Sequence, residues 1–160
     1  MNSKLDELLV TFFYLGKLPK MPGTFGSLGG LLILFSPEFD LWMYSLIVSF
    51  LLILISYNSV KRYEKIHGND NSKIVIDEVV GMMIIFSNPY MEISEIWVLV
   101  SFVLFRIFDI LKPFPINKIN EKIGSHFVFL DDIAAALFTM IFIQLLQVFS
   151  RIVPFWINFL

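Results

Sequence analysis

Long uncharged hydrophobic runs alternate with short polar segments along this 160-residue chain. Residues 41–60 carry no charge over 20 positions, and residues 133–150 carry none over 18. A helix of about 20 apolar residues crosses a hydrocarbon core of about 30 Å. Both runs therefore predict transmembrane helices.

Three further hydrophobic segments lie between these runs or before them, at about residues 24–36, 77–88 and 93–111. The first two are short, so the sequence is compatible with full spans or with re-entrant segments. The third is apolar except for Arg106 and Asp109 near its end. With segments at about 41–60 and 131–150, they predict an all-α, polytopic membrane helical bundle of four to five membrane segments.

An amphipathic helix is predicted within residues 1–16. Its apolar residues recur at helical spacing, at Leu5, Leu8, Leu9, Phe12 and Phe13. A helix of about 12 residues is too short to span a bilayer. We expect it to lie at the membrane interface or against the bundle, and an ordinary buried amphipathic helix fits the same pattern.

Composition supports an integral membrane protein formed by a single domain over residues 1–160. Hydrophobic residues make up 57% of the chain, the mean hydropathy is +0.77, and charged residues make up only 16%. The net charge of −2 provides no basic surface for nucleic acid. With no cysteine, disulfides and thiolate chemistry are excluded.

The distribution of cations predicts the orientation. The turns at 36–40 and 87–95 contain acids and no Lys or Arg, whereas ten lysines and arginines fall on the opposite side. By the positive-inside rule, that side faces the cytoplasm. Four polar clusters share this side, because three hydrophobic segments begin there and the segment at 93–111 ends there.

The first polar cluster is the glycine-rich start at residues 22–30. Thr24 is a suitable N-cap, and a helix start containing Thr24, Gly26 and Ser27 exposes backbone N–H groups that suit a phosphate. Gly26 and Gly30 also have the spacing of a helix-packing motif, which is the more common use of such a pattern.

Carboxylates form the second and fourth clusters, at Asp77-Glu78 with Asp70 nearby and at Asp131-Asp132. Acidic residues at helix starts are often caps that interact with the helix dipole. The third cluster contains Arg106, Asp109 and Lys112. Arg106 and Asp109 are three residues apart, so they form either a structural ion pair or part of a functional site.

Five or more carboxylates on one face would repel one another strongly without a divalent cation. This favours Mg²⁺, which prefers oxygen ligands. The metal ligands are then expected among Asp70, Asp77, Glu78, Asp131 and Asp132. The phosphate-binding residues are expected to be Thr24, Gly26, Ser27, Arg106 and Lys112, and the catalytic residues Asp77, Glu78, Asp109 and Asp132.

Successive motifs of the chain resemble those of the bacterial phosphatidylglycerophosphatase A family. They are PGTFGSL at 22–28, Asp70 with IVIDEVVG at 74–81, FRIFDILKPFPI at 105–116, and Asp131-Asp132. The resemblance implies a Mg²⁺-dependent lipid phosphatase of the bacterial inner membrane. Its substrate would be phosphatidylglycerol phosphate, hydrolysed at the cytoplasmic face in phospholipid biosynthesis.

The same residues are compatible with direct attack by water or with an aspartyl-phosphate intermediate. Alternative functions are another membrane lipid phosphohydrolase and, less favoured, a non-enzymatic ion or proton pathway. A pathway would place acids near the middle of the spans, whereas these acids stand at helix starts. The partners expected are the lipid substrate and the bilayer, and a homo-oligomer is compatible with the sequence.

Overall fold

The computed structural model describes residues 3–34, 40–69, 71–120 and 124–157, and these residues contain helices and no strand. The all-α class is thereby confirmed for the described chain. Its elements in order are α1 (Ser3–Val10), the 3-10 helix η1 (Leu15–Lys17), α2 (Pro22–Leu34), α3 (Leu41–His67), α4 (Ile76–Ile85), α5 (Glu95–Leu111), α6 (Ile116–Asn120) and α7 (Phe127–Ile157).

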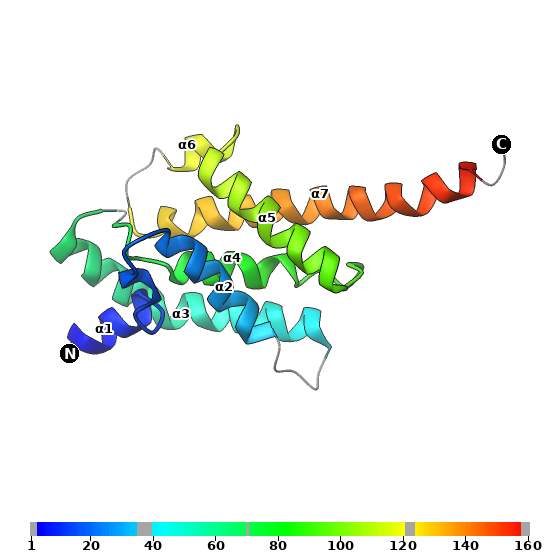
Figure 1. Ribbon diagram of the computed structural model, residues 1–160. Helices are drawn as coiled ribbons and strands as arrows, with labels where there is room; N and C mark the ends of the chain where they lie inside the picture. The colour runs from blue at the N-terminus through cyan, green and yellow to red at the C-terminus, as the bar shows by residue number, and fades with distance from the viewer. Residues whose placement is uncertain (1–2, 35–39, 70, 121–123, 158–160) are drawn as a thin grey trace.

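Helix α4 is the centre of the bundle (Figure 1), where it contacts α2, α3 and α7. Val79, Val80 and Met82 on this helix are fully buried. Its ten residues extend only about 15 Å, half the thickness of a hydrocarbon core. Because neighbouring helices surround it, α4 can be short without exposing its ends to lipid.

Two helices of the described chain are long and apolar enough to cross a membrane, at Leu41–His67 and Phe127–Ile152. They flank α4, and α7 continues past the rest of the bundle toward the C-terminus (Figure 1). Helix α5 has 17 residues and α2 has 13. The predicted number of four to five membrane segments therefore remains a prediction, because the helix lengths neither support nor contradict it.

Glycines on α2 allow close packing against α4. A Cβ atom placed on Gly26 would lie 2.8 Å from Val75 Cβ, and one on Gly30 would lie 2.8 Å from Met82 Cβ and 2.9 Å from the Val79 carbonyl oxygen. The Gly26–Gly30 spacing therefore serves helix packing, one of the two interpretations that the sequence allowed.

We expect the substitution Gly30→Ala to destabilise the fold. The added methyl group would meet backbone atoms that cannot rotate away, and such overpacking costs about 1–3 kcal/mol. Thermal unfolding in detergent micelles should show a lower melting temperature for Gly30→Ala. The variant Leu32→Ala, at a position 70% exposed on the same helix, should melt close to the parent protein. Equal melting of all three proteins would contradict this packing role.

The N-terminal helix is shorter than the sequence predicted. Helix α1 ends at Val10, and Phe12, Phe13 and Tyr14 adopt left-handed backbone conformations with φ of 40°, 54° and 68°. The chain then turns back, so the apolar residues at 12 and 13 follow the helix rather than extend it. Helix α1 packs on α3, and an ion pair between Asp6 and Arg62 joins the two.

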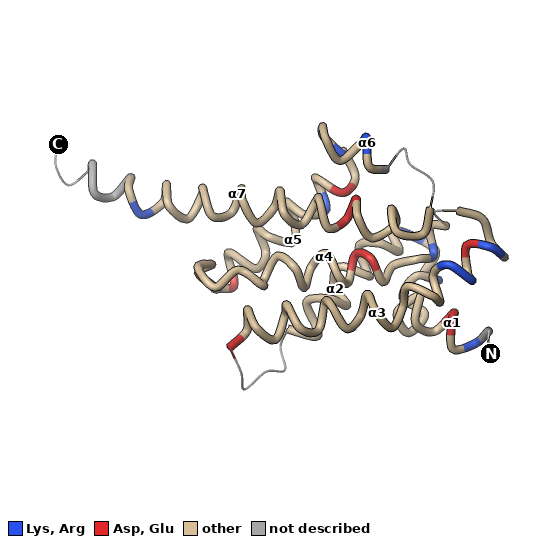
Figure 2. The backbone as a smooth tube through the Cα atoms, turned by 180° about the vertical axis from the view of Figure 1, so that it is seen from behind, with Lys and Arg blue, Asp and Glu red and all other residues tan. Residues whose placement is uncertain are grey.

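Charged residues gather at one end of the bundle (Figure 2). The starts of α4 and α7 lie at this end together with α1 and the cationic end of α3, while the middle of the bundle is nearly free of charge. The few charges toward the opposite end belong to the start of α3, the segment before α5 and the C-terminal part of α7. This segregation of charge is the pattern that the order of polar and apolar segments predicted.

Candidate active site

A polar pocket of about 250 Å³ opens at the charged end of the bundle. It receives residues from the start of α2, the start of α4, the end of α5 and the start of α7, together with the loop before α4. Its lining residues are Met21, Pro22, Gly23, Asn71, Ser72, Ile74, Asp77, Glu78, Arg106, Asp109, Lys112, Asp131 and Asp132. The four sequence clusters therefore contribute to one pocket.

Three carboxylates converge in this pocket. One oxygen each from Asp77, Glu78 and Asp132 lies within 4.8 Å of the others. Asp77 and Asp132 are only 8% and 4% exposed. The Glu78 backbone N–H donates to Asp77 Oδ1 at 3.1 Å, which fixes the orientation of the Asp77 carboxylate. Adjacent carboxylates thus reach the same point although their Cβ atoms diverge around the helix.

The carboxylate set fits a divalent cation. The buried oxygens Glu78 Oε2 and Asp132 Oδ2 have no hydrogen-bond partner in the described part of the chain. Unsatisfied, ionised oxygens this close together would be strongly unfavourable without a cation between them. Carboxylate oxygens are also the protein ligands that Mg²⁺ prefers.

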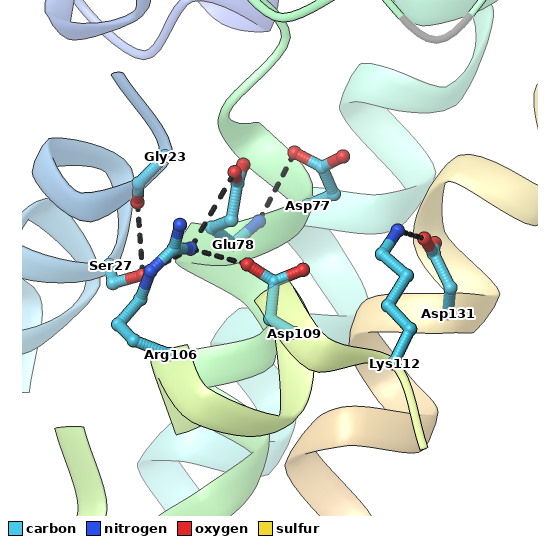
Figure 3. A network of polar contacts seen from close by, with 8 residues as sticks. All are labelled: Gly23, Ser27, Asp77, Glu78, Arg106, Asp109, Lys112 and Asp131. Carbon is cyan, nitrogen blue, oxygen red and sulfur yellow. Dashed lines mark hydrogen bonds and ion pairs between the residues drawn. The ribbon is translucent and has the colours of Figure 1, made fainter. Parts of the chain in front are cut away.

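Arg106 joins α5 to the carboxylates and to α2 (Figure 3). Its Nη1 atom lies 2.6 Å from Asp109 Oδ2 and 3.8 Å from Glu78 Oε1, and it donates to Ser27 Oγ at 3.3 Å. Ser27 in turn donates to the Gly23 carbonyl oxygen at 3.0 Å. Arg106 Nε is buried without a partner among the described residues, so the protein's own groups do not satisfy every donor of the guanidinium.

Lys112 forms a separate ion pair beside the three carboxylates. Its Nζ atom lies 2.5 Å from Asp131 Oδ2. Burial lowers the pKa of Lys112, but the hydrogen bond with Asp131 and the charges of neighbouring acids outweigh burial, and the pKa lies above its usual value. Lys112 is therefore protonated at neutral pH. Asp131 is paired with this cation, while its neighbour Asp132 joins Asp77 and Glu78.

The other described residues that the sequence predicted in the site do not line the pocket. Asp70 is outside the described residues. Thr24 is half-buried within the first turn of α2, which begins at Pro22, so Thr24 is not the N-cap that the sequence predicted. Gly26 faces Val75, and Ser27 contacts the pocket through Arg106 rather than by lining it.

Gly23 is a site residue that the sequence analysis did not single out. A Cβ atom at this position would lie 2.1 Å from Glu78 Oε1 and 3.0 Å from Arg106 Nη2. Only a residue without a side chain allows both groups to lie this close to α2. Asn71 and Ser72 also line the pocket, and their position in a polar loop gave no signal beyond turn formation.

We expect Gly23→Ala to lower activity while preserving the fold. The new methyl group would displace the Glu78 carboxylate, the far end of a flexible side chain, and a displacement of about 1 Å in a catalytic group can cost up to about 100-fold in rate. Steady-state phosphate release, the activity that the sequence resemblance leads us to expect, should show this loss in kcat/KM. The variant Leu32→Ala on the same helix should keep the parental rate, and an unchanged rate in Gly23→Ala would contradict the role of this close approach.

The fold and the site define an all-helical protein with an acidic, arginine-containing pocket at one end of an apolar bundle. The chain belongs to the phosphatidylglycerophosphatase A family, whose model matches residues 8–147. It is 33% identical over 144 residues to phosphatidylglycerophosphatase A of Haemophilus influenzae, covering 88% of both chains. The resemblance noted from the sequence motifs is therefore confirmed.

Two further relatives have the same level of identity. Phosphatidylglycerophosphatase A of Escherichia coli is 33% identical over 132 residues, covering 81% of this chain and 76% of the relative. A protein of Bacteroides thetaiotaomicron, provisionally named a phosphatidylinositol-3-phosphatase, is 33% identical over 147 residues, covering 88% and 92%. No solved structure matches the chain significantly.

Proposed function

We propose that this protein is a Mg²⁺-dependent phosphatase that hydrolyses phosphatidylglycerol phosphate to phosphatidylglycerol and inorganic phosphate. Family membership supports the activity and the phospholipid substrate. The observation that carries the chemistry is the convergence of Asp77, Glu78 and Asp132 within 4.8 Å beside Arg106. This arrangement combines anionic metal ligands with a cation suited to phosphate.

In this proposal, Asp77, Glu78 and Asp132 hold Mg²⁺, and Asp131, the sequence neighbour of Asp132, pairs with Lys112 beside them. When bound, the ion would supply Lewis-acid polarisation of a phosphoryl oxygen and lower the pKa of a bound water. Two buried oxygens that have no hydrogen-bond partner among the described residues, on Glu78 and Asp132, support this assignment.

The cations of the pocket bind the phosphate. Arg106 uses its planar fork to hold phosphate oxygens, and Asp109 and Ser27 keep its guanidinium at the pocket wall. Lys112 adds a point charge and neutralises Asp131. Both cations stabilise the transition state, because negative charge spreads over the oxygens of the transferred phosphoryl group.

The reaction requires an acceptor for one proton of water. A carboxylate oxygen of the pocket that does not hold the ion accepts it as the water oxygen bonds to phosphorus. The ester P–O bond breaks, and the released lipid hydroxyl oxygen takes a proton from solvent at the pocket mouth. The carboxylate then releases its proton to solvent, so the products are phosphatidylglycerol and inorganic phosphate, with no net change in the protein.

We further propose that the protein is a multi-pass protein of the bacterial cytoplasmic membrane with its pocket facing the cytoplasm. The lysine-rich end of the bundle, which contains the pocket, supports this orientation. The acyl chains of the substrate would then stay at membrane depth, while the head group enters the pocket from the aqueous interface.

Phosphate release by the purified protein tests the proposal. In detergent micelles, we expect release from phosphatidylglycerol phosphate with Mg²⁺ and loss of release with excess EDTA, restored by adding Mg²⁺ back. Phosphatidylinositol 3-phosphate should be compared in parallel, because the name of the Bacteroides relative makes it the second candidate substrate. Absence of release from phosphatidylglycerol phosphate, with or without Mg²⁺, would reject the proposed function.

A further inference from the structure

An apolar groove of about 540 Å³ lies between α2 and α5, outside the polar pocket. Its walls are Leu28 and Leu31 of α2, Val98, Leu99 and Phe102 of α5, and the segment at residues 93–95. A volume of this size is typical of small-molecule sites. The catalytic pocket does not include any of these residues.

The groove and the phosphate-binding end of the site lie along the same faces of α2 and α5. On α2, Gly23, Ser27 and Leu31 follow one another at four-residue spacing, so they share one face of the helix. The first lines the polar pocket, the second bonds to Arg106, and the third lines the groove. This face of α2 therefore changes from polar to apolar along its length.

Helix α5 shows the matching pattern in the opposite chain direction. Val98, Phe102 and Arg106 are also four residues apart and share one face. The contact between Arg106 Nη1 and Ser27 Oγ, at 3.3 Å, joins the two helices where the groove meets the pocket. From Phe102 to Glu95 the groove wall extends about 10 Å along the helix axis, and Arg106 follows one turn beyond Phe102.

We propose that this groove holds one acyl chain of the lipid substrate while its phosphate lies at Arg106. This inference rests on the proposed function and adds the site that orients the lipid. The phosphate and the acyl chains belong to one lipid molecule. The groove lies along α2 and α5 on the faces that also carry Ser27 and Arg106, so a lipid whose phosphate lies at Arg106 has an apolar surface beside it for one chain. Holding the chain positions the phosphorus relative to the carboxylates.

Tryptophan substitutions that fill the groove test this inference. Leu28 and Leu99 line the groove and are 39% and 63% exposed, so larger side chains fit there without disturbing the core. We expect Leu28→Trp and Leu99→Trp to lower kcat/KM for diacyl phosphatidylglycerol phosphate by about tenfold or more through misplacement of the phosphate. Activity on the deacylated head group, glycerophosphoglycerol phosphate, should not change.

Leu145→Trp is the matched control, because Leu145 is 62% exposed and lines a separate apolar groove on α7. It should retain parental activity on both substrates. Equal losses on the diacyl and deacylated substrates in the groove variants, or no loss on either, would overturn the inference.

Photolabelling of the parent protein tests binding independently of turnover. A phosphatidylglycerol phosphate with a photoreactive group in one acyl chain should label peptides of α2 and α5, and unlabelled phosphatidylglycerol phosphate should compete. Equal labelling by a photoreactive phosphatidylcholine, without competition, would mean that bulk lipid fills the groove and would reject the inference. If labelling succeeds but no phosphate is released, the proposed function fails while the lipid site stands.

Discussion

Asp132→Asn is expected to lower kcat/KM for phosphatidylglycerol phosphate by at least about 100-fold, since even residues that only support metal ligands cost about 10- to 100-fold when changed. Asparagine keeps the shape of the side chain and removes its negative charge. Asp132 is 4% exposed and its Oδ2 atom has no hydrogen-bond partner in the described chain, so this oxygen is the one that the proposed ion would satisfy. Phosphate release across a Mg²⁺ titration measures the effect.

The stability of Asp132→Asn should not fall together with its activity. Removing one of three carboxylates within 4.8 Å relieves repulsion, so Asp132→Asn should unfold at the same or a higher temperature than the parent protein in EDTA. Adding Mg²⁺ should raise the melting temperature of the parent protein, because a ligand that binds only the folded state stabilises it. The variant should show a smaller Mg²⁺-dependent rise.

Asp40→Asn provides the control for charge removal. Asp40 is exposed beside the start of α3 and its side chain makes no capping hydrogen bond there. This variant should match the parent protein in activity and in the Mg²⁺-dependent rise of the melting temperature. Full activity of Asp132→Asn, with an unchanged response to Mg²⁺, would reject the metal assignment.

The positions of the helices could be predicted from the sequence better than their ends. The uncharged run at 41–60 corresponds to α3, but the helix continues to His67. Its last seven residues include lysine, arginine and glutamate, which favour helices, and Arg62 is held by Asp6 of α1. An uncharged run identifies only the apolar part of a helix. The helix continues beyond it as long as backbone hydrogen bonds and packing contacts support it.

The polar clusters could be placed on one side of the bundle from the alternation of segments, yet their partners could not. Asp131 and Asp132 are adjacent, and only the rotation of α7 against α4 and α5 decides which one faces the carboxylates. Asp132 approaches Asp77 and Glu78, while Asp131 pairs with Lys112. The rotation of a helix about its axis depends on the packing of many side chains from other helices, and it cannot be predicted from the residue pattern of one segment.

The glycines show the same limit. The spacing of Gly26 and Gly30 was compatible with phosphate binding and with helix packing, and the structure places both against α4. Gly23, which was part of the motif but carried no separate signal, is the glycine that approaches Glu78 and Arg106. Its importance comes from a contact between helices that are distant in sequence.

Arg106→Lys is expected to lower kcat/KM by about 100-fold although the charge is retained, a loss typical of removing one positioned donor to the transition state. Arginine presents several donors in a fixed plane, whereas lysine provides one flexible ammonium group. In the structure, Arg106 Nη1 alone reaches Asp109 and Ser27, while Nε is free of partners within the described chain. Lysine cannot keep these contacts and bind phosphate at once.

Arg62→Lys is the control for an arginine-to-lysine change. Arg62 pairs with Asp6 between α1 and α3, outside the polar pocket, and its replacement should leave kcat/KM near the parental value. Arg106→Lys with parental activity would contradict a fork-dependent phosphate contact. Melting temperatures of both variants identify any loss that arises from the fold.

A double-mutant cycle with Asp109→Asn separates two roles for this acid. If Asp109 acts by holding Arg106 at 2.6 Å, its replacement lowers kcat/KM in the parent protein but has little further effect in Arg106→Lys. Full additivity of the two losses would instead support the separate catalytic role that the sequence predicted for Asp109. We expect non-additivity, because the Asp109 carboxylate is paired with Arg106 and is not one of the three carboxylates that converge within 4.8 Å.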